Sequence, residues 1–423
     1  MRILRHTDPD FAAALASLQR KSEPHPQVEA TVREIISDVR TRGDRALLAL
    51  TEKFGGPKLT TKQLRVTSAA KVDAATREAI STAQANVRAF AERSLRKNWS
   101  AKNAQGASVG ERFDPFQRVG IYVPGGTAPL VSTAVMTVTL AAAADVPEIV
   151  VTTPADRSGK INEALLFALG YCGATEIYPV GGAQAIAALA YGTETIRPVQ
   201  KIAGPGNAYV VEAKRQVFGR VAIDLLPGPS EILVLADASA NAAWVASDLL
   251  AQAEHGHNSS ILFVTDSAKL LKAVEAEIAR QLATLSRKDA LAGVLEHDAA
   301  LILVRRLADG VAIANEFAPE HISLVTKRDD EIAAQLRTSG AIFLGGYSPV
   351  AAGDFLAGPS HTLPTGGAGK SFPGLMVDMF QRRTSIVRFD ARSLKKSVAT
   401  IAKFSEIEGL DAHGRSATIR FEK

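Results

Sequence analysis

From about residue 118 to residue 344, short apolar runs alternate with segments of helical periodicity, and this alternation constrains the fold more than any other feature of the sequence. The run 149–153 is continuous, apolar and rich in β-branched residues, as expected for a strand buried on both faces of a sheet. Glycine-rich turns separate many of these runs from the helical segments. Such a pattern predicts an α/β fold with largely parallel sheets and helices on both faces.

The alternation runs in two series, which together predict two α/β domains. The first series predicts strands at 118–123, 149–153, 176–180, 201–203 and 221–226, with helices at 129–144, 161–169, 183–189 and 208–217. The second series predicts strands at 232–236, 260–265, 301–304, 322–325 and 341–344, with helices at 242–255 and 268–285. The turn Gly228-Pro229-Ser230 is the predicted junction between the two series.

The two ends of the chain have different patterns. Residues 28–53 and 69–96 are predicted as long helices, separated by a break at Gly55-Gly56-Pro57. The last stretch, 376–423, loses the alternation and is predicted to be helical and charged.

Composition excludes several classes of function. The chain has 423 residues, 46% hydrophobic and 22% charged, which is typical of globular proteins with more than one core. Its net charge is +5, but the basic residues are scattered among acids, so we expect no nucleic-acid partner. One cysteine, Cys172, excludes a disulfide framework and a cysteine metal site. No apolar run is long enough for a signal peptide or a membrane span, so we expect a cytoplasmic protein without a membrane partner.

Two glycine-rich stretches imitate nucleotide-binding motifs but fail as such. Gly204-Pro205-Gly206 begins like a dinucleotide fingerprint, yet Tyr209 stands where the third glycine is required. Gly369-Lys370-Ser371 imitates the end of a phosphate loop, but the earlier glycine is replaced by Pro364. What remains is a set of glycine-rich turns between strands and helices, where backbone N–H groups can bind anions.

Glu320 and His321 stand side by side at the start of an apolar run. Neither residue type is favoured at the start of a strand, and a glutamate is seldom buried unless it is paired. At neutral pH the pair can supply an acid, a base or both. The alternative is a strand entrance whose polar side chains face water.

Five further polar residues suggest a metal site. Gln252 and His255 are three apart near the end of a predicted helix, so they share one face. Asp354 and His361 lie in a glycine-rich loop, and His413 precedes Gly414. Imidazole, carboxylate and amide ligands suit Zn²⁺, Mn²⁺ or Co²⁺. The alternative is a hydrogen-bonded helix end, and spacing alone leaves both open.

Taken together, these stretches resemble histidinol dehydrogenase, the family that catalyses the end of histidine biosynthesis. The resemblance spans about residues 25 to 420 and rests on blocks at 120–126, 181–189, 204–210, 228–231, 252–256, 318–321 and 410–413. Two departures from the family pattern are His257-Asn258 after the predicted zinc helix and Pro373 where serine is usual. Neither departure touches a residue to which the family gives a role.

The resemblance implies roles for particular residues. The zinc ligands would be Gln252, His255, Asp354 and His413, and the acid–base pair would be Glu320 and His321. Contacts to the substrate amino alcohol would come from Ser230, His321, His361 and Glu408 together with the zinc ligands. NAD would be bound by Tyr122, Gln184 and Asn207.

The resemblance also implies an architecture. It predicts two incomplete Rossmann-like domains, similar to those of aldehyde dehydrogenases, with small terminal helical segments in an intertwined homodimer. The expected division is an N-terminal segment at 1–22, a first domain at 23–121 plus 231–375, a second, NAD-binding domain at 122–230, and a tail at 376–423. The tail would reach the partner subunit, which would place Glu408 and His413 in the partner's active site.

The implied reaction is the zinc-dependent, four-electron oxidation of L-histidinol to L-histidine through the aldehyde, with NAD as oxidant. In this interpretation His321 is the base that removes the hydroxyl proton, and Glu320 activates water to attack the aldehyde. Cys172 lies far in sequence from every polar cluster, which favours the water route over a cysteine adduct. Because neighbours on a strand point to opposite faces, Glu320 and His321 are expected in the loop before the strand.

Three alternatives stay open at this stage. A relative of the family could oxidise a different small primary alcohol, although Ser230, His361 and Glu408 argue against it. A zinc hydrolase could use Glu320 as its base and need no nucleotide, but the chain lacks a His-Glu-x-x-His helix. A non-catalytic binding module is disfavoured by the many polar residues at turns.

Overall fold

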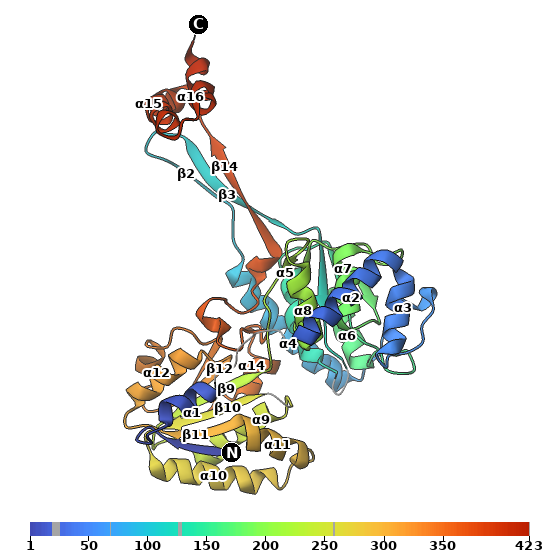
Figure 1. Cartoon of the computed structure of the whole chain (residues 1–423), viewed down its shortest axis with the longest axis vertical. Coiled ribbons are helices and arrows are strands. Elements are labelled where there is room, and N and C mark those ends of the chain that lie inside the picture. The colour runs from blue at the N-terminus through green and yellow to red at the C-terminus, as the bar shows by residue number, and fades with distance from the viewer. Residues whose placement is uncertain (19–25, 68, 126–128, 257–258, 423) are drawn as a thin grey trace.

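Two α/β units and a projecting arm make up the molecule (Figure 1). The computed structural model describes residues 1–18, 26–67, 69–125, 129–256 and 259–422. Among these residues, no helix is both long enough and apolar enough to cross a membrane.

The first unit is built on a five-stranded parallel sheet with the order β6-β5-β4-β7-β8. Its strands are β4 (Arg118–Tyr122), β5 (Glu148–Thr152), β6 (Glu176–Tyr178), β7 (Lys201–Ala203) and β8 (Ala222–Ile223). One core packs α4 (Ala74–Ser94), α5 (Val131–Ala143) and α6 (Glu163–Cys172) against the sheet. A second core packs α2 (Pro26–Arg42), α3 (Asp44–Lys53), α7 (Gly182–Tyr191) and α8 (Ala208–Val217). The strand order reverses between β4 and β7, the position where doubly wound sheets bind ligands.

The second unit is built on a six-stranded parallel sheet with the order β1-β11-β10-β9-β12-β13. Its strands are β1 (Arg2–Arg5), β9 (Glu231–Ala236), β10 (Ser260–Thr265), β11 (Ala299–Leu303), β12 (His321–Val325) and β13 (Ala341–Leu344). One core contains α9 (Ala242–Ala253), α10 (Ala268–Leu282) and α11 (Lys288–Asp298). The other contains α12 (Leu307–Phe317), α13 (Asp329–Ala333) and side chains of α1 (Phe11–Leu18). The short helix α14 (Val350–Phe355) packs against α9.

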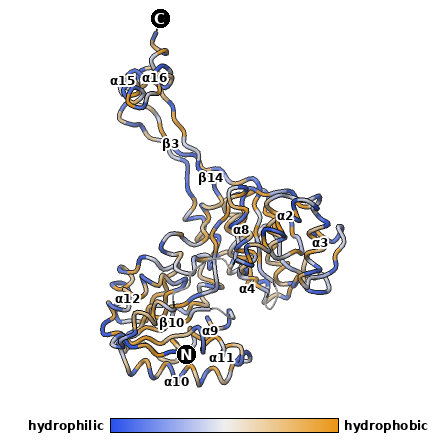
Figure 2. The backbone as a smooth tube through the Cα atoms, in the orientation of Figure 1, coloured by the Kyte–Doolittle hydropathy of each residue, from blue (hydrophilic) through white to orange (hydrophobic). Residues whose placement is uncertain are grey.

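The arm is a three-stranded antiparallel sheet that carries two helices at its tip (Figure 1). Its strands are β2 (Trp99–Lys102), β3 (Ser108–Pro115) and β14 (Gln381–Arg388), and its helices are α15 (Ala391–Glu408) and α16 (Asp411–Thr418). Several large apolar side chains on the arm are exposed, among them Val387 at 64%, Phe404 at 59% and Ile407 at 68%. Hydrophobic positions therefore recur along the arm as well as in the two sheets (Figure 2).

Local sequence signals explain where several helices begin. The side chains of Asn162, Asn207 and Asn241 accept hydrogen bonds from backbone N–H groups in the first turns of α6, α8 and α9. Each asparagine thereby satisfies a donor that has no partner within its helix. The alternation of strands and helices expected from residue 118 onward is confirmed, although the strand expected at 221–226 is reduced to β8 at 222–223.

The helices near the N-terminus differ from the expected domain division. Residues 23–121 were expected to join the unit formed by 231–375, but α2, α3 and α4 pack on the five-stranded sheet. Their apolar faces pack against α5, α7 and α8, which follow much later in the sequence. Residues 1–22 were expected as a separate segment, yet β1 is an edge strand of the six-stranded sheet. The expected boundary at residue 22 lies outside the described residues.

Two other expectations need correction. The helix expected at 28–53 is divided at Gly43, whose φ of 54° favours glycine. There the Glu194 carboxylate accepts the N–H of Asp44 at 2.7 Å and fixes the start of α3. The tail was expected to be helical throughout, but residues 381–388 form β14, which pairs along its whole length with β3. Because β3 lies about 270 residues earlier, local periodicity does not reveal this pairing.

Candidate active site

A buried carboxylate, Glu320, lies at the amino-terminal edge of the six-stranded sheet. The Ser230 hydroxyl donates a hydrogen bond to Glu320 Oε2, and the Glu231 N–H donates to the same oxygen at 2.9 Å. Glu320 is only 7% exposed. Burial raises the pKa of Glu320 to about 8, against the lowering effect of the two hydrogen bonds, and the nearby charge of Asp354 raises it further. Near neutral pH this carboxyl group therefore exists in both protonation states.

His321 is oriented by the backbone beside it. Its Nδ1 lies 3.1 Å from the carbonyl oxygen of Glu231, which can only accept a hydrogen bond. Nδ1 therefore carries the proton in the neutral ring, and Nε2 is left with a lone pair. Nε2 lies 3.7 Å from Asp354 Oδ1. Burial lowers the pKa of His321, and Asp354 and the Glu231 carbonyl oppose that effect. The unprotonated, basic form is thus favoured at neutral pH.

The position of the pair differs in part from the expectation. Glu320 precedes β12, as expected, but His321 is the first residue of the strand and pairs with Ile232 and Ala341. The two side chains are nevertheless in contact: Nδ1 of His321 lies 3.5 Å from Oε2 of Glu320. Glu320 lies outside the strand, so its side chain does not have to point to the face opposite that of His321. The alternative, a strand entrance whose polar side chains face water, is wrong, since both residues are buried.

His361 is fixed between the two units. Its Nδ1 lies 3.0 Å from the carbonyl oxygen of Asp354, and its Nε2 lies 3.1 Å from the hydroxyl of Thr133 in α5. The Asp354 carbonyl requires a proton on Nδ1, so the Thr133 hydroxyl donates to Nε2. Desolvation lowers the pKa values of both His361 and His255, and the charge of Asp354 opposes it in each. His255, His321, Asp354 and His361 thus share one electrostatic environment.

The candidate metal ligands are brought together only in part. α9 ends at Ala253, so His255 lies just beyond the helix and not on its last turn as expected. Gln252 is buried, and its Nε2 has no hydrogen-bond partner in the described part of the chain. The packing of α14 on α9 brings Asp354 toward these two residues. An amide, an imidazole and a carboxylate are ligand types that zinc accepts. Among the described residues, however, no group of three His, Cys, Asp or Glu side chains forms a metal site.

The remaining two predicted residues lie elsewhere in the same chain. Glu408 ends α15, and His413 lies in α16, both at the tip of the arm (Figure 1). α9 and β12 lie at the other end of the molecule (Figure 1). A single chain therefore does not unite Glu408 and His413 with the cluster around Glu320.

The predicted cofactor residues lie at the carboxyl ends of strands in the five-stranded sheet. Tyr122 ends β4, and its hydroxyl accepts the N–H of Gly182 at 3.2 Å. Gln184 is buried in the first turn of α7, and its Oε1 has no partner in the described part of the chain. Asn207 caps α8 with hydrogen bonds of 3.1 Å to two backbone N–H groups. The N-termini of two helices and the reversal of strand order meet here, as in sites for anionic nucleotides.

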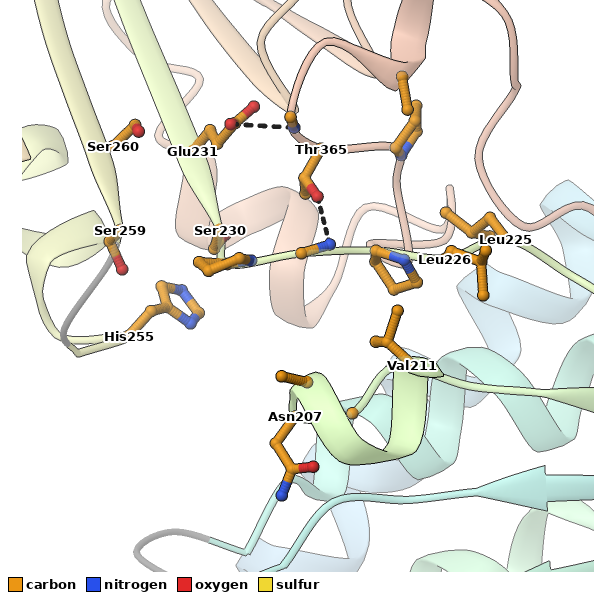
Figure 3. A pocket seen from close by; sticks show the side chains of 18 of the residues that line it. Asn207, Val211, Leu225, Leu226, Ser230, Glu231, His255, Ser259, Ser260 and Thr365 are labelled. Atoms are coloured by element: carbon orange, nitrogen blue, oxygen red, sulfur yellow. Dashed lines mark hydrogen bonds between the residues drawn. The ribbon is translucent and has the colours of Figure 1, made fainter. Parts of the chain in front are cut away.

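A pocket of about 1210 Å³ lies between the two units. Figure 3 shows Ser230 and His255 on one side of it and Asn207 and Val211 on the other. The segment from Leu225 to Ser230 crosses between the two sides. The pocket thus connects the carboxyl edge of one sheet to the amino edge of the other. Its size allows a dinucleotide beside a small substrate.

Two residues of the site were given no role from the sequence. Thr133 belongs to an apolar helical run, where a threonine resembles an ordinary core residue. Glu231 follows Ser230, and its backbone N–H and carbonyl bind Glu320 and His321 while its side chain accepts the N–H of Gly366 at 3.0 Å. An acidic residue at the head of an apolar strand was the only available signal for Glu231. Gly126, His257 and Asn258, which were noted in the sequence, lie outside the described residues.

Comparison with known proteins shows the family. A family model described as histidinol dehydrogenase matches residues 18–421. The chain belongs to the histidinol dehydrogenase family. A histidinol dehydrogenase from Geobacillus kaustophilus is 45% identical over 414 residues, which cover 96% of this chain and 97% of that protein. One from Agrobacterium fabrum is 43% identical over 424 residues, covering 99% and 98%.

A solved structure agrees with the fold. The crystal structure of histidinol dehydrogenase from Elizabethkingia anophelis has a TM-score of 0.94 to this chain, with 32% identity, and covers 99% of this chain and 98% of that one. The resemblance to the histidinol dehydrogenase family that the sequence suggested is therefore confirmed over nearly its whole length. The arm and both sheets belong to this shared fold.

Proposed function

We propose that this chain oxidises L-histidinol to L-histidine in two successive hydride transfers, as the histidinol dehydrogenase family name implies. The observation that carries the proposal is the buried cluster of Ser230, Glu320 and His321, of which Ser230 lines the pocket between the units and Glu320 and His321 lie behind it. It places a basic imidazole nitrogen and a carboxyl group with a pKa near neutrality next to each other.

His321 serves as the base of the alcohol oxidation. Its Nδ1 is held by the Glu231 carbonyl, so Nε2 is free to take the hydroxyl proton of the substrate. The charge of Asp354, 3.7 Å from Nε2, stabilises the imidazolium ion that forms. NAD, when bound on the side of Tyr122, Gln184 and Asn207, accepts the hydride that leaves the carbinol carbon.

Glu320 serves in the aldehyde oxidation. The aldehyde carbon has no second hydride to give until water adds to it and makes it tetrahedral. In its ionised form Glu320 removes a proton from that water, and Ser230 holds the carboxylate in place. The His321 imidazolium returns its proton to the carbonyl oxygen as the hydrate forms, and the neutral imidazole then removes a hydroxyl proton of the hydrate for the second transfer.

Zinc would be held by Gln252, His255 and Asp354 of one chain and by His413 of a second copy. Zinc held by these residues would supply a Lewis acid that helps to orient the substrate. Ser230, His361 and Glu408 would complete the contacts to the substrate. This assignment requires the intertwined homodimer, for which the exposed apolar side chains of the arm provide the support.

The proposal is tested by assay of the purified, zinc-loaded protein. We expect L-histidinol to yield about two NADH per molecule oxidised, and a chelator to abolish this activity until zinc is restored. Absence of NADH formation with zinc present would refute the proposal. Faster turnover of another small primary alcohol would favour the alternative of a relative with a different substrate.

A further inference from the structure

A fully buried ion pair lies behind residues 204–207, the turn that leads to the predicted cofactor residue Asn207 and is called the cofactor turn below. Lys214 in α8 and Asp224, just after β8, form a salt bridge, and both side chains have zero exposure. Lys214 Nζ also donates to the carbonyl oxygens of Gly204 and Leu225, each at 2.8 Å. The ammonium group thus donates to two backbone carbonyl oxygens and lies against one carboxylate. None of the functions assigned so far uses this pair.

The pair holds the peptide groups on both sides of Gly204. Asp224 Oδ2 accepts the N–H of Gly204 at 2.7 Å, while Lys214 binds its carbonyl oxygen. Gly204 has a φ of 116°, and a Cβ atom there would lie 2.1 Å from the carbonyl oxygen of Tyr122. The turn is therefore pressed against the end of β4 in a conformation that favours glycine. The ion pair fixes that conformation from the other side.

The same lysine fixes the segment that leads to the catalytic residues. Leu225 begins the connection between the two units, and five residues later Ser230 binds Glu320. Gly204 begins the turn that ends at Asn207, the cap of α8. Both segments line the pocket at 206–208 and 224–231 (Figure 3). One ammonium group thus ties the cofactor side of the pocket to the substrate side.

Stability alone does not require a charged pair at this place. A buried ion pair contributes little net stability, because desolvation of both charges offsets their attraction, and an apolar pair of similar volume is often as stable. The charged pair instead fixes the positions of three backbone groups, namely the N–H and carbonyl of Gly204 and the carbonyl of Leu225.

We propose that Lys214 and Asp224 are positioning residues that set the spacing between the cofactor turn and the catalytic cluster, and so the affinity for NAD. This inference rests on the proposed function for the identity of the cofactor. Neither residue touches the reacting atoms; each acts through Gly204, Leu225 and the segments that follow them.

The test is the double variant Lys214→Met/Asp224→Asn in the full-length, zinc-loaded protein. Because neither charge remains, no unpaired ion is left buried, and the fold is expected to persist by circular dichroism. We expect the KM for NAD to rise about tenfold, whereas the Kd of L-histidinol measured by calorimetry without NAD changes less than twofold. An unchanged KM for NAD in the folded variant overturns the inference.

A matched control is the ion pair of Arg118 and Glu176 at the opposite edge of the same sheet, where the side chains are 7% and 12% exposed. Arg118→Met/Glu176→Gln should lower the thermal midpoint without changing the KM for NAD. An equal rise in that KM in the control would show a general effect of destabilisation and would also overturn the inference.

A milder variant covers the case in which the double variant does not fold. Lys214→Arg keeps the charge beside Asp224, so no unpaired ion is left buried, but its planar guanidinium cannot donate to the carbonyl oxygens of Gly204 and Leu225 with the same geometry. We expect about a threefold rise in the KM for NAD, and no rise overturns the inference. A wild-type protein that does not reduce NAD at all would instead refute the proposed function.

Discussion

At the scale of single residues, Glu320 and His321 are adjacent in sequence but are tuned in opposite directions. Burial raises the pKa of the carboxyl group and lowers that of the imidazole, since it disfavours whichever form is charged. The first shift brings the pKa of the carboxyl group toward neutral pH, and the second keeps the imidazole unprotonated and basic there. The two residues can therefore serve different steps of one reaction.

Substitution of Glu320 by glutamine should separate these steps. Glu320→Gln keeps the hydrogen bond from Ser230 but removes the base that activates water. We expect aldehyde oxidation to slow by roughly 10²–10⁴-fold, with a smaller loss in alcohol oxidation. Stopped-flow measurement of NADH from L-histidinol and from L-histidinal compares the two; equal losses would contradict the role in water activation.

Substitution of His321 should impair both half-reactions. His321→Asn can retain the hydrogen bond to the Glu231 carbonyl through its side-chain amide, but it has no basic nitrogen at the position of Nε2. We expect both half-reactions to slow by about 10²-fold or more. If either half-reaction keeps its wild-type rate, His321 takes no part in that step.

At the scale of secondary-structure elements, the two sheets contribute to the pocket by opposite edges. Tyr122 and Asn207 follow the carboxyl ends of β4 and β7, whereas Ser230 and His321 lie at the amino ends of β9 and β12. The connection 224–230 leaves one sheet and enters the other, so these edges face each other. Ligands usually bind at the carboxyl ends of parallel strands, so only the five-stranded sheet contributes by the usual edge.

An ion pair between Arg118 and Glu176 lies at the amino-terminal edge of the five-stranded sheet, where β4 and β6 begin. The Arg118 guanidinium donates to both oxygens of Glu176 at 2.9 Å and, with the Tyr178 hydroxyl, lowers the pKa of Glu176 to about 2 against the effect of burial. A carboxylate whose pKa is depressed on folding contributes stability above its unfolded pKa, and loses it as the pH falls toward the folded value.

Glu176→Gln should therefore destabilise the protein in a manner that depends on pH. We expect a loss of roughly 2 kcal/mol at pH 7, which shrinks as the pH falls from about 4.5 to about 2. Chemical denaturation of the variant and the wild type across this range measures the difference. A difference that stays constant with pH would show that the ion pair is not responsible.

At the scale of the whole molecule, the arm is the feature that a single chain does not explain. Phe404 and Ile407 are exposed on α15. His413 belongs to α16, which lies at the other end of the molecule from α9 (Figure 1). Exposed apolar surface of this kind marks an interaction site. Exchange of arms between two copies would cover the apolar side chains and complete the proposed zinc site at once.

Mixing two inactive variants tests this exchange. His255→Asn and His413→Asn should each be inactive alone. A heterodimer with shared sites has one site with both histidines intact, so random mixing should restore about a quarter of the wild-type activity. Subunit exchange is verified by mass spectrometry with differently tagged chains. No recovery after verified exchange would show that the sites are not shared.

The sequence by itself determined most of the elements between residues 118 and 344, and it determined the family. Runs such as 149–153 and 260–265 become strands because apolar content, β-branching and bounding turns are local properties. Asn207 and Asn241 likewise specify helix starts through hydrogen bonds two or three residues away. Extended blocks of residues were enough to indicate the histidinol dehydrogenase family.

Only the tertiary structure decided which distant residues and elements are in contact and how burial shifts their pKa values. The Ser230 hydroxyl bonds to Glu320, 90 residues away in sequence, and β14 pairs with a strand about 270 residues earlier. Helix α2 packs on helices that follow much later in the sequence. No local pattern encodes such pairings, because they depend on which surfaces match once all elements have formed. The pKa of Glu320 follows from its burial, which is a property of the folded molecule. The sequence therefore named the acid–base pair, and packing set its protonation.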